Sequence, residues 1–407
     1  MEISIDICIF AGRNNFLTQN NKSMKKIMQW VMAATIICGF NMLTSCTSSE
    51  DNPVVPDMNV HIDKARFPDD NFRAYLLEQD YGQDGVITAD EIADISSIIV
   101  RAMEITSLKG IEYFTALEQL VCDYNELTEL DVSHNPELTW LDCSYNQLTS
   151  LDVSNCKMLG LLFCYANELT SLDVSNCKML ELLYCYGNEL TSLDLTNCTE
   201  MKYLDFEENQ LTTIDLSKNT ELTYLVCDNN LLTELDLTHN QALEDVRCGS
   251  NQLTALDVSN NPNLESIICY YNQIASLDVS HNPELTWLDC GPNNFTELDL
   301  SKNPKLEYLG IALSGFTRLD VSNNPALENL IVFCNNINGQ NMTDLINSMP
   351  QTDEAHPRYF YVIKEYRSEE GNVITQSQVA AAKAKGWSVL YLKDKDAEWE
   401  DYPGTAD

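Results

Sequence analysis

The stretch LTELDVSHNPELTWLDCSYNQ, residues 127–147, opens a series of copies that follow one another every 21 residues. Its second leucine, Leu130, recurs once in each copy, at Leu151, Leu172, Leu193, Leu235, Leu256, Leu277, Leu298 and Leu319, with Ile214 in the same register. Residues 133–143 and 280–290 are identical, which indicates that the copies arose by duplication. This period predicts a solenoid in which each copy forms one coil and stacks on the next.

Each copy divides into a strand and a longer extended part. In Leu141-Asp142-Cys143 the alternation expected of a strand turns the outer two side chains inward and the middle one outward. The segment LTxLDVSxNP is too short and too rich in Asp, Ser, Asn and Pro for a helix. We therefore expect parallel strands on the concave face and extended segments with turns on the convex side.

One inward position of the strand is almost always cysteine. It holds Cys122, Cys143, Cys164, Cys185, Cys227, Cys248, Cys269 and Cys290, and Phe206, Ile311 and Val332 replace it elsewhere. A position shared with phenylalanine and aliphatic residues is a packing position, and buried thiols behave as small hydrophobes. The sequence has no C-x-x-C pair, so we expect reduced, structural thiols. Three further cysteines are expected at a tight corner of the coil, Cys156, Cys177 and Cys198.

Two polar columns accompany the apolar ones. An asparagine recurs where each coil must turn, from Asn125 to Asn293, and its amide can bond the backbone of its own and adjacent coils. An aspartate recurs from Asp131 to Asp320 on the convex side. Each aspartate either accepts backbone N–H bonds at its turn, helped by the Ser or Thr two residues on, or contributes to a stripe that binds divalent cations.

The leucine, cysteine and asparagine columns together resemble a leucine-rich repeat, of the 21-residue, cysteine-ladder type known from internalin J, a bacterial surface adhesin. The resemblance covers about residues 106–340. It implies a leucine-rich-repeat solenoid that serves as an interaction scaffold, and it does not carry over a ligand.

The beginning of the chain is predicted to be a targeting signal. Lys25 and Lys26 precede a mostly apolar stretch, and Leu43-Thr44-Ser45-Cys46 follows. This resembles a bacterial lipoprotein signal in which Cys46 is diacylated; an uncleaved anchor and an ordinary secretory signal are the alternatives. A lipid at Cys46 predicts an outer-membrane lipoprotein, exposed at the surface, that meets the membrane only through this anchor.

The repeats are expected to be closed at both ends. We divide the chain into a leader (1–46), a tether (47–59), a small helical N-terminal cap (60–105), the repeats (106–340), and a β-α-β C-terminal cap with an acidic tail (341–407). The tail, from Lys393 onward, is expected to fray.

The N-terminal cap contains a loop that resembles an EF-hand. Its calcium ligands would be Asp80, Asp84, the Val86 carbonyl and Glu91. Gly82 occupies a position where a carboxylate is usual, so the loop either binds Ca²⁺ or merely joins two helices. No other cofactor is expected.

Charge and motifs narrow the function to binding. The formal net charge of −38 disfavours nucleic acid and anionic lipid as partners. The five histidines lie in separate coils or opposite caps, and no catalytic motif is present, so we expect a non-enzymatic protein.

The outward strand positions are rich in aromatic residues: Trp140, Phe163, Tyr165, Tyr184, Tyr186, Tyr203, Tyr224, Tyr270, Trp287 and Tyr308. An apolar surface of this kind marks a binding site, so we expect a protein partner, with glycan binding by a nutrient-capture lipoprotein as the alternative. Side chains in stacked columns could instead simply shield one another.

Overall fold

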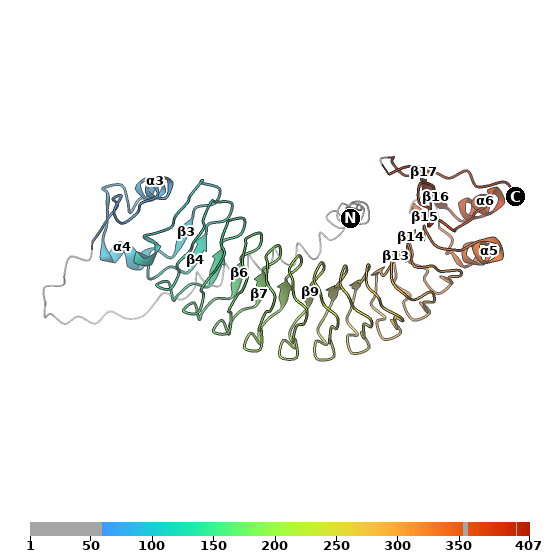
Figure 1. Ribbon diagram of the computed structural model, residues 1–407, viewed down its shortest axis with the longest axis horizontal. Helices are drawn as coiled ribbons and strands as arrows, with labels where there is room; N and C mark the ends of the chain where they lie inside the picture. The colour runs from blue at the N-terminus through green and yellow to red at the C-terminus, as the bar shows by residue number, and fades with distance from the viewer. Residues whose placement is uncertain (1–58, 353–356, 396) are drawn as a thin grey trace. The chain divides into compact units, whose positions relative to one another are not determined.

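The computed structural model describes residues 59–352, 357–395 and 397–407, and these lie in one compact unit. Its main feature is a 15-stranded sheet in which each strand pairs with the next one along the chain (Figure 1). Eleven repeat strands follow the first strand, β3 (Ser97–Ile99): β4 (Gln119–Val121), β5 (Trp140–Asp142), β6 (Leu161–Phe163), β7 (Leu182–Tyr184), β8 (Tyr203–Asp205), β9 (Tyr224–Val226), β10 (Asp245–Arg247), β11 (Ser266–Ile268), β12 (Trp287–Asp289), β13 (Tyr308–Gly310) and β14 (Asn329–Ile331). The strands from β3 to β16 run parallel, which confirms the predicted leucine-rich-repeat solenoid.

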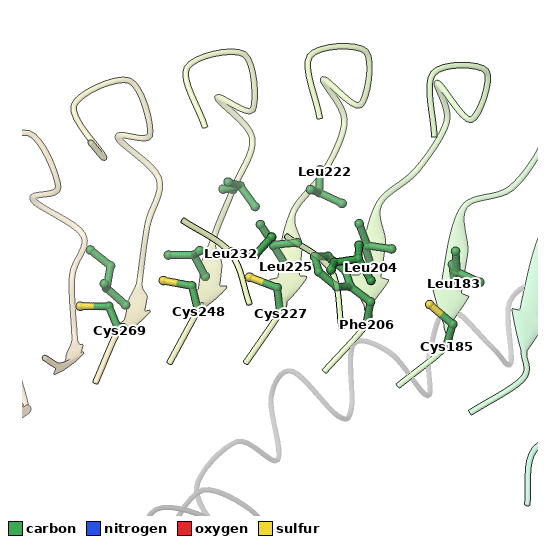
Figure 2. Packing of buried hydrophobic residues seen from close by; sticks show 14 of the residues in the cluster. Leu183, Cys185, Leu204, Phe206, Leu222, Leu225, Cys227, Leu232, Cys248 and Cys269 are labelled. Carbon is green, nitrogen blue, oxygen red and sulfur yellow. The ribbon is translucent and has the colours of Figure 1, made fainter. Parts of the chain in front are cut away.

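The core is a stack of identical layers. The middle residue of each repeat strand is fully buried, and the cysteine column lies beside it, also fully buried. Figure 2 shows the labelled cysteine side chains in a row, with the ring of Phe206 in the place of one of them. All twelve cysteines of the described residues are free and buried, so the predicted packing role is confirmed. Burial raises the pKa of the Cys143 thiol well above its usual value, which keeps it protonated and unreactive.

The asparagine column forms a hydrogen-bonded ladder along the coil corners. The Asn188 amide donates to the carbonyls of Cys164 (3.1 Å), Cys185 (3.0 Å) and Tyr186 (3.4 Å). Its Oδ1 accepts the Leu169 N–H at 3.0 Å. The residue just before the ladder position has a positive φ in every described coil except that of Asn293, which follows Pro292. The predicted ladder is therefore present, and it bonds each coil to the one before it.

A second asparagine ladder lies at the turn before the strand. Its members are fully buried and donate to carbonyls of the preceding coil: Asn135, Asn219, Asn240, Asn261, Asn282, Asn303 and Asn324. Cys156, Cys177 and Cys198 take this position in three coils, and their thiols lie 3.5–3.8 Å from the same kind of carbonyl. The corner predicted for these cysteines is thus confirmed.

The convex aspartates close local turns. In all ten, Oδ1 accepts the N–H of the residue two positions on, at 2.9–3.0 Å. The hydroxyl and N–H of Ser133 hold the pKa of Asp131 below its usual value. Among the described residues no group of three or more His, Cys, Asp and Glu side chains is arranged to hold a metal ion. The turn interpretation therefore accounts for this column.

Small structures close the two ends of the stack. At the start, β1 (Val60–His61) pairs antiparallel with β2 (Val86–Ile87), beside α3 (Asp70–Glu78) and α4 (Ala89–Asp94). A short 3₁₀ helix, Ile111–Tyr113, precedes β4. At the other end lie α5 (Gly339–Ser348), β15 (Arg358–Lys364), α6 (Gln376–Ala384), β16 (Trp387–Leu392) and β17 (Glu400–Asp401). Buried Phe72 and Leu76 of α3, and Met342 and Leu345 of α5, join the same core as the repeats.

The expectation that the tail frays is wrong. β17 pairs antiparallel with β16, and Tyr402 is buried. The Trp399 ring lies edge-on to Tyr361 at 4.9 Å, and the Gln376 N–H donates to the Thr405 carbonyl at 2.8 Å. The prediction relied on the acidic composition of the tail and overlooked Trp399 and Tyr402, which attach this segment to the edge of the sheet.

Candidate binding face

The side chains that point away from the core define one continuous surface, which we call the outer sheet face. It comprises the first and third residues of each repeat strand and the residue two positions further on. Register pairing places equivalent residues of successive coils side by side, as for Leu161 and Leu182 or Phe163 and Tyr184. A column of this face therefore reads along the stack as one residue per coil.

Seven of the predicted aromatic residues form one connected group, which we call the aromatic run. Phe163 and Tyr184 stack at 5.2 Å between ring centroids, and Tyr165 and Tyr186 stack at 4.4 Å. The run extends from Tyr184 to Tyr203 at 4.7 Å and to Tyr224 at 5.5 Å. Its members are Trp140, Phe163, Tyr165, Tyr184, Tyr186, Tyr203 and Tyr224, all half-buried. They shield one another in part, and each remains partly exposed to solvent.

The other three predicted aromatic residues lie further along the sheet. Trp287 and Tyr308 stack face to face at 3.6 Å, and Tyr270 lies edge-on to Tyr271 at 5.9 Å. The ten residues thus belong to one face: seven form the aromatic run, Trp287 and Tyr308 form a second stack beyond β10 and β11, and Tyr270 follows β11.

Three exposed tyrosines of the repeats were missed by the sequence reasoning, Tyr124, Tyr145 and Tyr271. Tyr124 and Tyr145 stack at 4.2 Å, and Tyr145 lies edge-on to Tyr165 at 5.3 Å. Both occupy the positive-φ corner position, where the side chain leaves the coil sideways, and both are at least 40% exposed. The signal was their position directly before a ladder asparagine.

A buried acidic group lies on the same face next to the aromatic run. We call it the acidic cluster; Asp205, Asp228 and Asp245 are buried, and Glu207 beside them is half-buried. Arg247 pairs with Asp245 at 3.2 Å. Burial raises the pKa of Asp205 to about 7, and burial raises that of Asp228 well above its usual value. The sequence indicated that these residues point outward. It did not predict their burial, because burial depends on the size of the neighbouring side chains on the same face.

The EF-hand-like loop does not gather its predicted ligands. Glu91 accepts both the N–H and the hydroxyl of Thr88 at 2.8 Å, as the partner in a capping box that begins α4. Asp84 Oδ1 accepts the Val86 N–H, and Asp80 Oδ1 accepts from the Gln83 amide. In this conformation the three carboxylates make local hydrogen bonds.

Calcium binding stays a prediction that titration can test. If the loop only joins α3 to α4, calorimetry will detect no calcium binding below millimolar concentration, because ligation requires Glu91 to abandon its helix cap. A Glu91→Gln variant keeps the capping acceptor and serves as the control. Submillimolar binding that this variant loses would establish the metal site.

The histidines of the repeats stay apart. His134, His239 and His281 each lie next to the hydroxyl of the preceding Ser or Thr, at 3.0–3.2 Å, in three different coils. No described helix is long and apolar enough to cross a membrane. The predicted lipid site at Cys46 lies outside the described residues.

Comparison with known proteins agrees with this architecture. Residues 228–246 match a family model described as a leucine-rich repeat. Over 70 residues the chain is 36% identical to internalin J of Listeria monocytogenes serotype 4b (strain F2365), a match that covers 17% of this chain and only 8% of that relative's length.

Solved structures from the same species are also similar. The functional domain of InlJ from Listeria monocytogenes, which includes a cysteine ladder, is 30% identical, with 75% of this chain and 83% of that chain covered and a TM-score of 0.44. An internalin, InlF, from Listeria monocytogenes strain 4b F2365 is 22% identical, with 82% and 97% covered and a TM-score of 0.70.

The stacked 21-residue coils and their parallel sheet define a leucine-rich-repeat protein. More particularly, the chain is an internalin-like leucine-rich-repeat protein with a cysteine ladder.

Proposed function

We propose that the protein is a non-enzymatic, adhesin-like scaffold that binds a protein partner through its outer sheet face. The observation that carries this proposal is the aromatic run, seven connected half-buried rings across β5 to β9. Aromatic side chains dominate the energy of protein interfaces because they bury large apolar areas with few rotatable bonds.

The extent of the face favours a macromolecular ligand. Tyr184 in β7 and Trp287 in β12 are five strands apart along the sheet. At ~4.8 Å per strand they are separated by roughly 24 Å, which a protein surface can cover and one or two sugar rings cannot.

We further propose that the scaffold is displayed on the bacterial surface by a lipid at Cys46. This part rests on the leader sequence, in which a basic pair and an apolar stretch precede Leu43-Thr44-Ser45-Cys46. A covalent anchor would leave the whole outer sheet face available to a partner.

Glycan binding is the second candidate, because Trp287 and Tyr308 form one flat, local stack with Asp289 in the same strand as Trp287. A sugar stacks on such a platform and hydrogen-bonds to a neighbouring carboxylate. This mode predicts a local footprint.

A pull-down from host-cell extract and a glycan array, run on the full chain, separate the two candidates. We expect a retained protein whose binding falls at least tenfold with Tyr184→Ala and also with Trp287→Ala, because both aromatic areas contact it. Met179→Ala is the matched control, since Met179 is 50% exposed and lies in the turn that precedes β7. A glycan as the only ligand, or a protein whose binding all three variants leave unchanged, would contradict the proposed function.

A further inference from the structure

Neighbouring coils are joined by three hydrogen bonds at the corner where the first asparagine ladder lies. Between the coils of β9 and β10, the Asn229 N–H donates to the Gly249 carbonyl at 3.0 Å. The Leu232 N–H donates to Asn251 Oδ1 at 3.0 Å, and the Gln252 N–H donates back to the Leu232 carbonyl at 2.9 Å. We call these the corner bonds. All three recur at each junction from β3–β4 to β10–β11 and again between β13 and β14.

None of the corner bonds is present between the coils of β12 and β13, within the part of the chain that the structure describes. Pro292 has no N–H to donate to the Ala312 carbonyl. The ladder residue of the β13 coil is Ser314, whose side chain is shorter than that of asparagine and whose hydroxyl donates to Ala312 in its own coil at 3.2 Å. The Phe295 N–H therefore has no ladder amide to accept it, and the Gly315 N–H does not donate back to the Phe295 carbonyl. We call this junction the open corner.

Apolar rings fill the core behind the open corner. The residue two positions after the ladder is leucine or isoleucine in the other repeat coils, but Phe295 and Phe316 occupy this position on the two sides of the open corner. Both are buried, and their rings meet edge-on with centroids 6.0 Å apart. Buried backbone groups such as those of Phe295 are nearly always paired in folded proteins. Apolar contacts are not directional, so this packing lets the two coils tilt without breaking a hydrogen bond at the corner.

The other sides of the same junction are intact. β12 and β13 pair in parallel register, with Trp287 opposite Tyr308. At the turn before the strand, the Asn324 amide donates to the carbonyls of Leu300 at 3.1 Å and Asn303 at 2.9 Å, so the second ladder crosses the junction without interruption. The two coils are therefore fastened along the sheet and along this turn, and they are free to part only at the corner.

From these observations we infer that the open corner is a hinge, at which the part of the chain from β13 to the C-terminal cap tilts relative to the coils before it. Hinges are formed by a few loop residues that absorb the movement of two packed bodies. The hinge goes beyond the proposed function and does not depend on it. It does affect the outer sheet face, because Trp287 and Tyr308, which stack at 3.6 Å, lie on its two sides.

Hydrogen exchange of single backbone amides in the full chain, read by mass spectrometry with fragmentation, tests the hinge. The Cys290 N–H donates across the open corner to the Gly310 carbonyl at 2.9 Å, and the Cys248 N–H makes the equivalent bond to Ile268 at 2.8 Å across an ordinary junction. Both cysteines are fully buried, so the two amides differ mainly in the corner beside them. After correction for intrinsic rates, we expect Cys290 to exchange at least tenfold faster than Cys248, because local opening exposes it.

A third amide separates a hinge from fraying of the chain end. The Ile311 N–H donates to the Ile331 carbonyl at 3.0 Å across the next junction, which has all three corner bonds and lies nearer the C-terminus. A hinge predicts that Ile311 exchanges as slowly as Cys248. Exchange of Ile311 as fast as that of Cys290 would show that the end of the stack frays, and would overturn the inference.

Ser314→Asn supplies the missing ladder amide, and we expect it to slow Cys290 exchange at least fivefold while leaving Ile311 within twofold. Ser301→Asn is the matched control, because Ser301 is exposed at a convex turn of the adjoining coil and the change adds the same side chain away from the corner. The reverse variant, Asn251→Ser, removes the ladder amide from an ordinary junction. It should speed exchange of the Cys227 N–H, which donates to the Arg247 carbonyl across that junction at 2.8 Å.

Equal exchange of Cys290 and Cys248 in the native chain would refute the hinge. So would a Ser314→Asn protein that melts like the native one and keeps its Cys290 exchange rate, or equal effects of Ser314→Asn and Ser301→Asn. If Ser314→Asn fails to fold, Asn251→Ser decides, and a Cys227 exchange rate that this variant leaves unchanged would show that the ladder amide does not control opening between coils.

Discussion

Replacing Asn188 with alanine is expected to lower the free energy of unfolding by about 1–3 kcal/mol. The substitution removes the acceptor of the Leu169 N–H and the donor to the Cys164 and Cys185 carbonyls, all of them at the buried corner between two coils. Water does not reach these groups, so they stay without partners in the variant. Urea unfolding followed by circular dichroism measures the difference.

The control for this variant is Asn176→Ala in the same region of the stack. Asn176 is exposed and donates to the Ser154 carbonyl at 3.1 Å, where water can replace it. We expect a change within about 0.5 kcal/mol, as for most surface positions. Two variants of equal stability would show that the ladder does not hold the coils together.

The two asparagine ladders differ in how often another residue replaces asparagine. Cysteine replaces asparagine in three coils of the second ladder, where Oδ1 of the remaining members has no partner among the described residues. In the first ladder the amide both donates and accepts, and Ser314 is the departure from asparagine between Asn125 and Asn335. A residue that satisfies a donor and two acceptors at once has few substitutes, whereas one that only donates to carbonyls can be replaced by a thiol.

The repeat made most of the fold predictable from sequence. Strand register, inward cysteines and the asparagine corner all follow from one 21-residue unit, because every coil has the same neighbours. The ends were harder to predict. β3 begins 22 residues before β4, which breaks the period, and the insertion of α5 leaves 30 residues between Asn329 and its partner Tyr359. At both ends the strand pairing depends on contacts that do not recur in the repeat, so the repeat could not predict it.

The binding face shows the same division. The four-ring contact of Phe163, Tyr165, Tyr184 and Tyr186 could be predicted, since adjacent coils bring equal positions together. The burial of Asp205 and Asp228 could not be predicted, because it depends on the sizes of side chains in three columns of the outer sheet face and in several coils.

The stability of the chain is expected to fall as the pH rises from 5 to 8, in part because of Asp205. Burial raises the pKa of this carboxyl to about 7 in the folded chain, against ~3.9 when unfolded. Between these values the folded chain binds more protons than the unfolded one, so raising the pH disfavours folding. At 1.36 kcal/mol per pH unit from pH 5 to the folded pKa, this carboxyl accounts for roughly 3 kcal/mol.

Asp205→Asn should therefore flatten the pH dependence and make the chain more stable than the native protein at pH 8. Asp236→Asn is the matched control, because hydrogen bonds from Thr238 hold the pKa of Asp236 below its usual value and leave it ionised in both states throughout this range. At pH 8, where both carboxyls are ionised in the folded chain, each variant removes one negative charge, so general repulsion changes equally in both. Urea unfolding at pH 5, 6, 7 and 8 gives the slopes. Parallel slopes for the two variants would mean that Asp205 is not buried as a protonated carboxyl in the folded chain, whereas a steeper slope for the native protein than for Asp205→Asn would show that burying this carboxyl lowers stability at neutral pH.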